Sequence, residues 1–160
     1  MDTSLIPAIP KDEEFLLAVY SSTRADEMAL VNWTTEQKQA FLLMQFNAQR
    51  QYYLDQFPQA QYYIIEQAGQ SIGRMIIDRS ENIILLMDIA LLPEYRKMGI
   101  GTALIKDLLE EADRANRPVR LHVETFNPAM NLYKRLGFIK TGEISFYHEM
   151  TRQPLVGEHV

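Results

Sequence analysis

The chain has 160 residues, 47% of them hydrophobic and 23% charged, and this composition predicts one soluble globular domain. Its net charge of -5 argues against a general nucleic-acid binder, because counterion release needs a positive field. No cysteine is present, which excludes disulfides, thiolate metal sites and a cysteine nucleophile. The three histidines do not have metal-ligand spacing, so we expect no metal.

The ends and the apolar runs predict a cytoplasmic protein with no membrane partner. The N-terminal residues contain no basic segment followed by an apolar run, so we expect no signal peptide. The longest apolar runs, such as 83–87, are far shorter than the roughly 20 residues that span a bilayer.

The first part of the chain predicts a short strand over 4–9 and helical structure over 12–30, broken near Ser21 and Ser22. Thr34 can cap a further helix, with Gln37 in the capping-box position. Apolar side chains at helical spacing extend this helix to about residue 55, and Pro58 stops it.

A β-rich block follows, with strands predicted over 61–67, 71–78 and 83–92. The turns between them are too short for parallel crossovers, so the three strands should form an antiparallel meander.

The spacing of apolar residues then changes to that of an amphipathic helix over 99–116, and a strand is predicted over 119–125. Asn127 and Pro128 predict the start of another helix, which Gly137 ends in a Schellman motif. Strands over 138–140 and 144–150 complete an α/β fold with a mixed, mostly antiparallel sheet flanked by helices. The tail after Met150 should fray.

The segment 88–104 predicts a strand, a short loop and a helix start, with Gly99 and Gly101 where the helix begins. Free amides at a helix start, together with Arg96 and Lys97, favour a phosphate ligand. The P-loop Lys-Ser or Lys-Thr is missing, and Leu104 replaces the third glycine of a dinucleotide fingerprint. A plain packing role for the two glycines stays open.

Two segments resemble the GNAT superfamily of N-acetyltransferases. The first reads Pro93-Glu94-Tyr95-Arg96-Lys97-Met98-Gly99-Ile100-Gly101, and the second reads Asn127-Pro128-Ala129-Met130-Asn131-Leu132-Tyr133-Lys134-Arg135-Leu136-Gly137-Phe138. The resemblance covers about 61–150 and implies one acetyltransferase domain over 1–160. In it, 1–60 form variable acceptor-side helices, 61–150 the donor-binding core and 151–160 the tail.

The resemblance implies acetyl-CoA as the donor, held where the strands before and after the central helix splay apart. The donor-binding residues implied are Ile89, Ala90, Leu91, Arg96, Lys97, Met98, Gly99, Ile100, Gly101, Thr102 and Asn127. Tyr133 would sit near the sulfur as a general acid. It follows Asn127 by six residues, whereas family members commonly have seven, which blurs the mapping upstream of Pro128.

The implied reaction is attack of a neutral primary amine on the thioester, and only about one lysine-like amine in 10³ is neutral at pH 7. His122 and Glu124 lie on one strand face and are the candidate bases. Asp88 is the next candidate, and a base acting through water is equally compatible. Because cysteine is absent, we expect direct transfer in a ternary complex.

Two other functions stay open: a non-catalytic acyl-CoA sensor on the same fold and a nucleotide-binding regulator. The acceptor is also open among small amines, polyamines, aminoglycosides and protein N-termini. The resemblance leaves a homodimer open as well.

Overall fold

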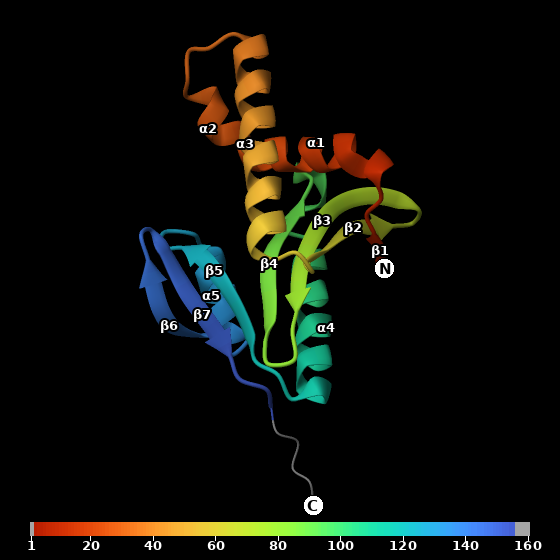
Figure 1. Ribbon diagram of the computed structural model, residues 1–160, viewed down its shortest axis with the longest axis vertical. Helices are drawn as coiled ribbons and strands as arrows, with labels where there is room; N and C mark the ends of the chain where they lie inside the picture. Colours follow the sequence, from red (N-terminus) through yellow and green to blue (C-terminus); the bar gives the residue numbers. More distant parts are fainter. Residues whose placement is uncertain (1, 156–160) are drawn as a thin grey trace, which may run out of the picture. The chain divides into compact units, whose positions relative to one another are not determined.

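A computed structural model describes residues 2–155 (Figure 1). The chain divides into two compact units, one comprising residues up to 76 with 88–100, the other 77–87 with the residues from 101 onward. Two strands, β3 (Gln70–Arg79) and β4 (Ile84–Leu91), contribute residues to both units.

Seven strands form one sheet in the order β1-β2-β3-β4-β5-β7-β6. The other five strands are β1 (Thr3–Pro7), β2 (Gln61–Gln67), β5 (Val119–Glu124), β6 (Ile139–Ile144) and β7 (Tyr147–Arg152). The predicted α/β class with a mixed sheet is therefore confirmed.

Strand directions follow from the pairing. β1 pairs with β2, and β7 pairs with both β5 and β6, all antiparallel. β4 pairs with β5 in parallel, through Ile84 opposite Val119 and Leu85 opposite Arg120. Each of these pairs lies at the start of its strand, before the residues of β4 that the sequence assigns to the donor.

The first unit contains α1 (Glu13–Thr23), α2 (Ala25–Ala29) and α3 (Thr35–Gln56), and α3 crosses α1 (Figure 1). The capping box forms as predicted, since Thr34 Oγ1 accepts from the Gln37 amide at 3.1 Å. A core cluster buries Leu16 and Tyr20 of α1, Phe46 of α3 and Ile64 of β2.

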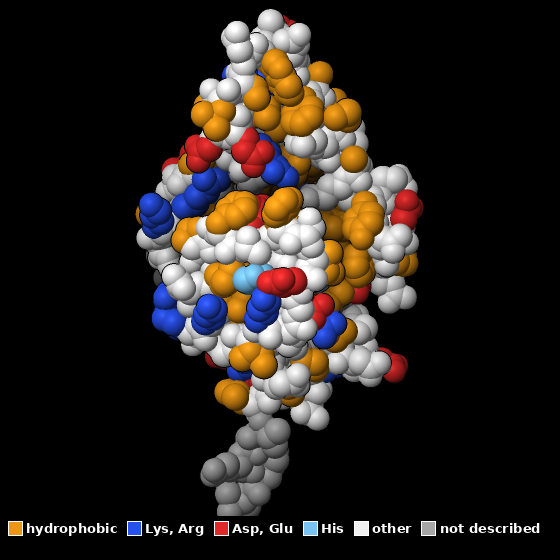
Figure 2. All heavy atoms as spheres, turned by 90° about the vertical axis from the view of Figure 1, so that its left-hand side faces the viewer, with side chains coloured by type: hydrophobic (Ala, Val, Ile, Leu, Met, Phe, Trp, Pro, Cys, Tyr) orange, Lys and Arg blue, Asp and Glu red, His pale blue; other side chains and the backbone are white. Residues whose placement is uncertain are grey.

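Hydrophobic side chains gather at the end of the first unit formed by α2 and the beginning of α3 (Figure 2). Leu30, Trp33, Leu43 and Met44 are exposed there. Trp33 packs edge-on against Phe41, with ring centroids 5.2 Å apart, so part of this apolar surface supports the helix itself.

In the second unit, the buried stripe of α4 (Ile100–Ala115) includes Leu104, Leu108 and Ala112, as its period predicts. The predicted Schellman motif ends α5 (Ala129–Arg135). The Phe138 amide donates to Tyr133 O at 3.0 Å, and the Gly137 amide donates to Lys134 O at 3.1 Å.

The last two strands are longer than the sequence predicts. β6 continues past Lys140 to Ile144 with an irregular register, and β7 continues past Met150 through the buried Thr151 and Arg152. Arg152 stays in the strand because its Nη1 donates to Asp113 Oδ1 at 2.5 Å. The prediction that the tail after Met150 frays is wrong for Thr151 and Arg152, which are buried in β7, and the part of the tail over 156–160 lies outside the described residues.

Candidate functional site

The last residues of β4 lie against a glycine of β3. A Cβ built on Gly73 would be 2.3 Å from the Ala90 carbonyl oxygen and 3.1 Å from Leu91 Cα. One residue earlier in β3, Ile72 O accepts from the Leu92 amide at 2.9 Å. Gly73 therefore sets how closely β3 approaches the segment 89–91, and sequence reasoning missed it. The available signal was a lone glycine inside a β-branched strand.

The loop after β4 turns through a short 3-10 helix, η2 (Pro93–Tyr95), and then through two left-handed residues. Lys97 has φ +63° and Gly99 has φ +82°, and α4 begins directly afterwards at Ile100. Space beside Gly99 is open, so glycine is favoured there by its backbone angle and not by crowding. The amides of Ile100, Gly101 and Thr102 are in the first turn of α4, where amides have no partner within the helix.

This loop fits a diphosphate. Helix-start amides carry the positive end of the helix dipole, and left-handed residues beside them turn further amides toward one side. The exposed Lys97 adds a cationic side chain next to them. The residues present are thus suited to the anionic end of a coenzyme A molecule.

The Arg96 side chain makes hydrogen bonds to other residues of the protein. Its Nε donates to Leu91 O at 2.9 Å, and its Nη2 donates to Ser22 Oγ at 3.2 Å. These bonds tie the loop to the end of β4 and to α1. The predicted contact between Arg96 and the donor stays a prediction.

Asp88, the third candidate base, is held by a buried arginine. Arg74 is only 2% exposed, and its Nε donates to Asp88 Oδ2 at 2.6 Å. Arg74 also donates to Gln49 Oε1 at 3.1 Å. A carboxylate that neutralises a buried guanidinium stabilises the fold, so the ion pair with Arg74 gives Asp88 a structural role.

His122 lies in the second unit, in a polar cluster on β5, β6 and β7 whose members contact Glu149. It is opposite Glu149 in the antiparallel register, with its Nε2 3.8 Å from Glu149 Oε2. Arg120 Nε is 3.6 Å from Glu149 Oε1, and Thr141 Oγ1 donates to the same oxygen at 2.8 Å. Glu149 therefore stands between a cation and the imidazole.

The His122 side chain is 46% exposed, whereas that of Glu149 is 22% exposed, so the imidazole is accessible and its carboxylate partner is more covered. Figure 2 shows a histidine beside an acidic side chain, with Lys and Arg side chains nearby. Sequence reasoning missed Glu149, because only the strand register shows which residue of β7 faces His122. Glu124 shares the strand face of His122 and is opposite Tyr147.

Asn127 and Tyr133 flank the start and the body of α5. Asn127 Oδ1 accepts from the amide of Ala129, the first residue of α5, at 2.9 Å, and the N-cap position is occupied by Pro128, one residue later than the sequence predicts. Tyr133 is half-buried and packs against Phe138, with ring centroids 5.8 Å apart. Both residues belong to the second unit with His122, whereas 88–100 belong to the first unit.

Within residues 2–155, no group of three or more His, Cys, Asp and Glu side chains could hold a metal ion. In the same part of the chain, no helix combines the length and the apolar character needed to cross a membrane.

The chain has clear relatives among known proteins. Residues 58–140 match the acetyltransferase (GNAT) domain. The chain is 33% identical over 66 residues to an N-alpha-acetyltransferase of Sulfurisphaera tokodaii and 43% identical over 67 residues to a thialysine N-epsilon-acetyltransferase of Bos taurus. These alignments cover 39% and 41% of the chain, and 40% and 39% of the two relatives.

The fold agrees with this match. The structure of the PaiA N-acetyltransferase of Thermoplasma acidophilum, solved with coenzyme A, superposes with a TM-score of 0.71 at 16% identity. The superposition covers 96% of this chain and 99% of that one. Since the domain match takes in more than half of the chain, the protein belongs to the GNAT acetyltransferase family.

Proposed function

We propose that this protein transfers the acetyl group of acetyl-CoA to a primary amine. The observation that carries the proposal is the domain match over 58–140, which contains β4, the following loop, α4, β5 and α5. Two of the relatives are named for acetyl transfer to an α-amine and to an ε-type amine.

The donor is proposed to lie along the end of β4 and the start of α4. The backbone of Ile89, Ala90 and Leu91, which follows the residues of β4 that pair with β5, would pair with the pantetheine arm. The amides from Lys97 to Thr102 would bind the diphosphate, with Met98 on the exposed side of the loop. Asn127 would contact the donor in addition to accepting from the Ala129 amide.

The proposed chemistry is a direct displacement. The amine nitrogen attacks the thioester carbonyl carbon, an oxyanion forms, and the carbon–sulfur bond breaks. A backbone amide of the donor strand would stabilise the oxyanion. The proton that the amine loses would go to His122, directly or through a water, and Tyr133 would donate a proton to the thiolate.

His122 is preferred over Glu124 as the base because it has a charged partner. A carboxylate oxygen lies 3.8 Å from Nε2, where it can orient the imidazole. Arg120 and Thr141 hold that carboxylate from its other oxygen. Glu124 stays the second candidate.

A release assay for free thiol tests this function. The protein is incubated with acetyl-CoA and a panel of a lysine-like amine, a polyamine, an aminoglycoside and peptides with free N-termini. Turnover with at least one amine, abolished in a His122→Ala and Tyr133→Phe double variant, is expected. Saturable acetyl-CoA binding with no turnover on any amine would instead favour the acyl-CoA sensor. The cytoplasmic location and a homodimer stay predictions from the sequence.

A further inference from the structure

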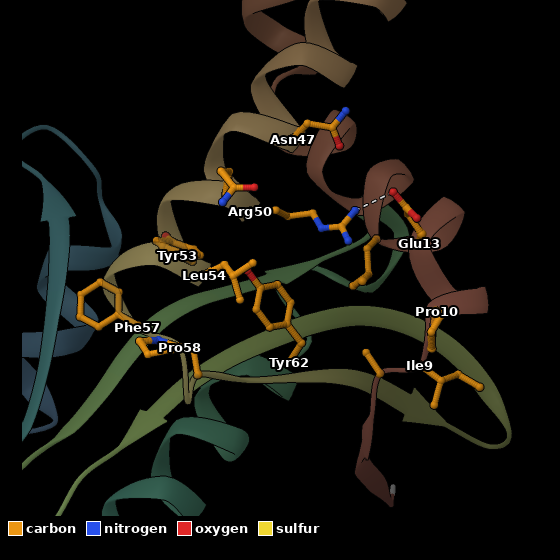
Figure 3. A pocket seen from close by; sticks show the side chains of 14 residues that line it. Ile9, Pro10, Glu13, Asn47, Arg50, Tyr53, Leu54, Phe57, Pro58 and Tyr62 are labelled. Atoms are coloured by element: carbon orange, nitrogen blue, oxygen red, sulfur yellow. Dashed lines mark hydrogen bonds and ion pairs between the residues drawn. The ribbon is translucent and has the colours of Figure 1, made fainter.

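The first unit contains a cavity of about 640 Å³ that the proposed reaction does not use. It lies between η1 (Pro10–Asp12), α1, the second half of α3 and the start of β2 (Figure 3). Its volume is within the range of small-molecule sites. None of the predicted donor-binding or catalytic residues line it.

One wall of the cavity carries an ion pair whose two groups have further hydrogen-bonding sites. Arg50 Nη1 of α3 donates to Glu13 Oε1 of α1 at 2.6 Å, as the dashed line in Figure 3 marks. A guanidinium has five N–H donors and a carboxylate has two oxygens, so this single bond leaves sites on both groups. The Arg50 guanidinium also lies over the Phe46 ring, 5.2 Å from its centroid, which limits its freedom.

Tyr62 points from β2 toward Arg50 and Leu54 in the cavity (Figure 3). Burial raises the pKa of its phenol, while the positive charges of Arg74 and Arg50 act in the opposite direction. The hydroxyl is therefore a protonated donor that points toward Arg50, since the charge of Arg74 is paired with Asp88. This side of the cavity favours a carboxylate.

The remaining walls are mostly apolar. Leu54, Phe57 and Pro58 come from the end of α3 and the residues after it, and Ile9 comes from the segment before α1. Figure 3 shows them around the same space as Arg50 and Tyr62. A ligand with an aliphatic or aromatic body would place that body here.

We propose that this cavity binds a hydrophobic α-amino acid as a zwitterion. Its carboxylate accepts from Arg50 and Tyr62, its ammonium donates to Glu13, and its side chain lies among the apolar walls. A simple carboxylic acid would bring a negative charge beside Glu13, and a simple amine would bring a positive charge beside Arg50. A zwitterion places its carboxylate beside Arg50 and its ammonium beside Glu13, so each of its charges lies next to an opposite charge.

Isothermal titration calorimetry of the full chain with L-leucine and L-phenylalanine tests the proposal. Saturable binding with one site is expected. Leucinamide, 4-methylpentanoic acid and glycine lack the carboxylate, the ammonium and the side chain respectively, and each should bind at least about tenfold more weakly. Absence of saturable binding of both amino acids, or equal affinity for 4-methylpentanoic acid and leucine, would overturn it.

Variants locate the site. Glu13→Gln removes the negative charge that pairs with the ammonium, and Tyr62→Phe removes the hydroxyl that donates to the carboxylate, so each should weaken leucine binding about tenfold. Glu27→Gln is the matched control, because it alters an exposed ion pair with Arg24 that does not line the cavity, and should not change affinity. Unchanged affinity in a folded Glu13→Gln protein would contradict the assignment. The titrations contain no acetyl-CoA, so their outcome is independent of the proposed acetyl transfer.

Discussion

Glu149 and His122 are direct partners across the antiparallel pair of β7 and β5, with 3.8 Å between the carboxylate Oε2 and the imidazole Nε2. Arg120 and Thr141 engage the other oxygen of the same carboxylate. This arrangement keeps a negative charge beside the imidazole. It makes Glu149 a positioning residue for the base that we propose.

Replacing Glu149 by Gln should lower kcat about two- to fivefold with acetyl-CoA affinity unchanged, because a partly exposed charge pair contributes up to about 1 kcal/mol. Steady-state kinetics and donor titration measure the two effects separately.

A double-mutant cycle distinguishes this role from general packing. In a His122→Ala background, Glu149→Gln should have no further effect on kcat, because the group it acts through is gone. Glu143→Gln serves as the control, since Glu143 pairs with Lys140 on β6 and not with His122. A full additional loss in the His122→Ala background would mean that Glu149 acts elsewhere.

Tyr133→Phe should lower kcat by about ten- to a hundredfold while donor affinity changes little, as expected for loss of a general acid whose ring packing is kept. The edge-on contact with Phe138 does not need the hydroxyl. Single-turnover rates and acetyl-CoA titration check this. Equal losses of affinity and turnover would assign Tyr133 to packing.

Gly73→Ala should weaken donor binding more than it weakens the fold. The new methyl group would lie 2.3 Å from Ala90 O, which is too close. β4 must therefore shift where the pantetheine arm is proposed to pair. Overpacking of this kind costs about 1–3 kcal/mol. Acetyl-CoA titration and thermal melting, with the exposed Ser71→Ala as the control, compare the two effects. Unchanged donor affinity would separate Gly73 from the donor site.

Asp113 should give the protein an acid-sensitive contribution to stability. A hydrogen bond from Arg152 holds the pKa of this carboxyl below its ordinary value of 3.8. Because the pKa is lower in the folded state, ionisation of Asp113 stabilises the fold at pH values above 3.8, its ordinary pKa. This contribution disappears as the pH falls through the lower pKa of the folded state.

Asp113→Asn should therefore lower the free energy of unfolding at pH 7 by about 2 kcal/mol, with a difference from the parent that shrinks below about pH 4. Urea denaturation across this range measures it. Asp107→Asn, on the exposed face of the same helix, should leave the curve unchanged. A constant difference at every pH would mean that the ion pair is not its source.

Much of the fold was predictable because local chemistry decides it. The Thr34 capping box and the Schellman motif at Gly137 depend on residues within one turn, and both form as predicted. The break between α1 and α2 also occurs, at Arg24, where the Ser22 and Thr23 hydroxyls bond to backbone carbonyls of the preceding turn.

Contacts distant in sequence were not predictable. Arg152 of β7 forms an ion pair with Asp113, and Arg74 forms one with Asp88. No local sequence pattern predicts either pair. Glu149 was missed for the same reason, since its partner follows from strand register. Arg96 donates to Leu91 and Ser22, contacts that the sequence does not report, and its contact with the donor stays a prediction.

Gly101→Glu should abolish donor binding, with a loss of about a hundredfold or more, because it places a carboxylate at the helix start proposed for the diphosphate. Glu110→Gln, at an exposed position of the same helix outside the proposed donor site, is the control and should bind normally. If a folded Gly101→Glu protein keeps its affinity for acetyl-CoA, the diphosphate does not bind at the start of α4.

The most direct test is an acetyl-CoA titration followed by backbone amide NMR of the parent protein. Gly99, Gly101 and Thr102 are expected to show the largest saturable shifts, and the shifts should be absent with a pantetheine thioester that lacks the diphosphate. Saturable binding that leaves these amides unmoved, or no binding at all, would contradict the account.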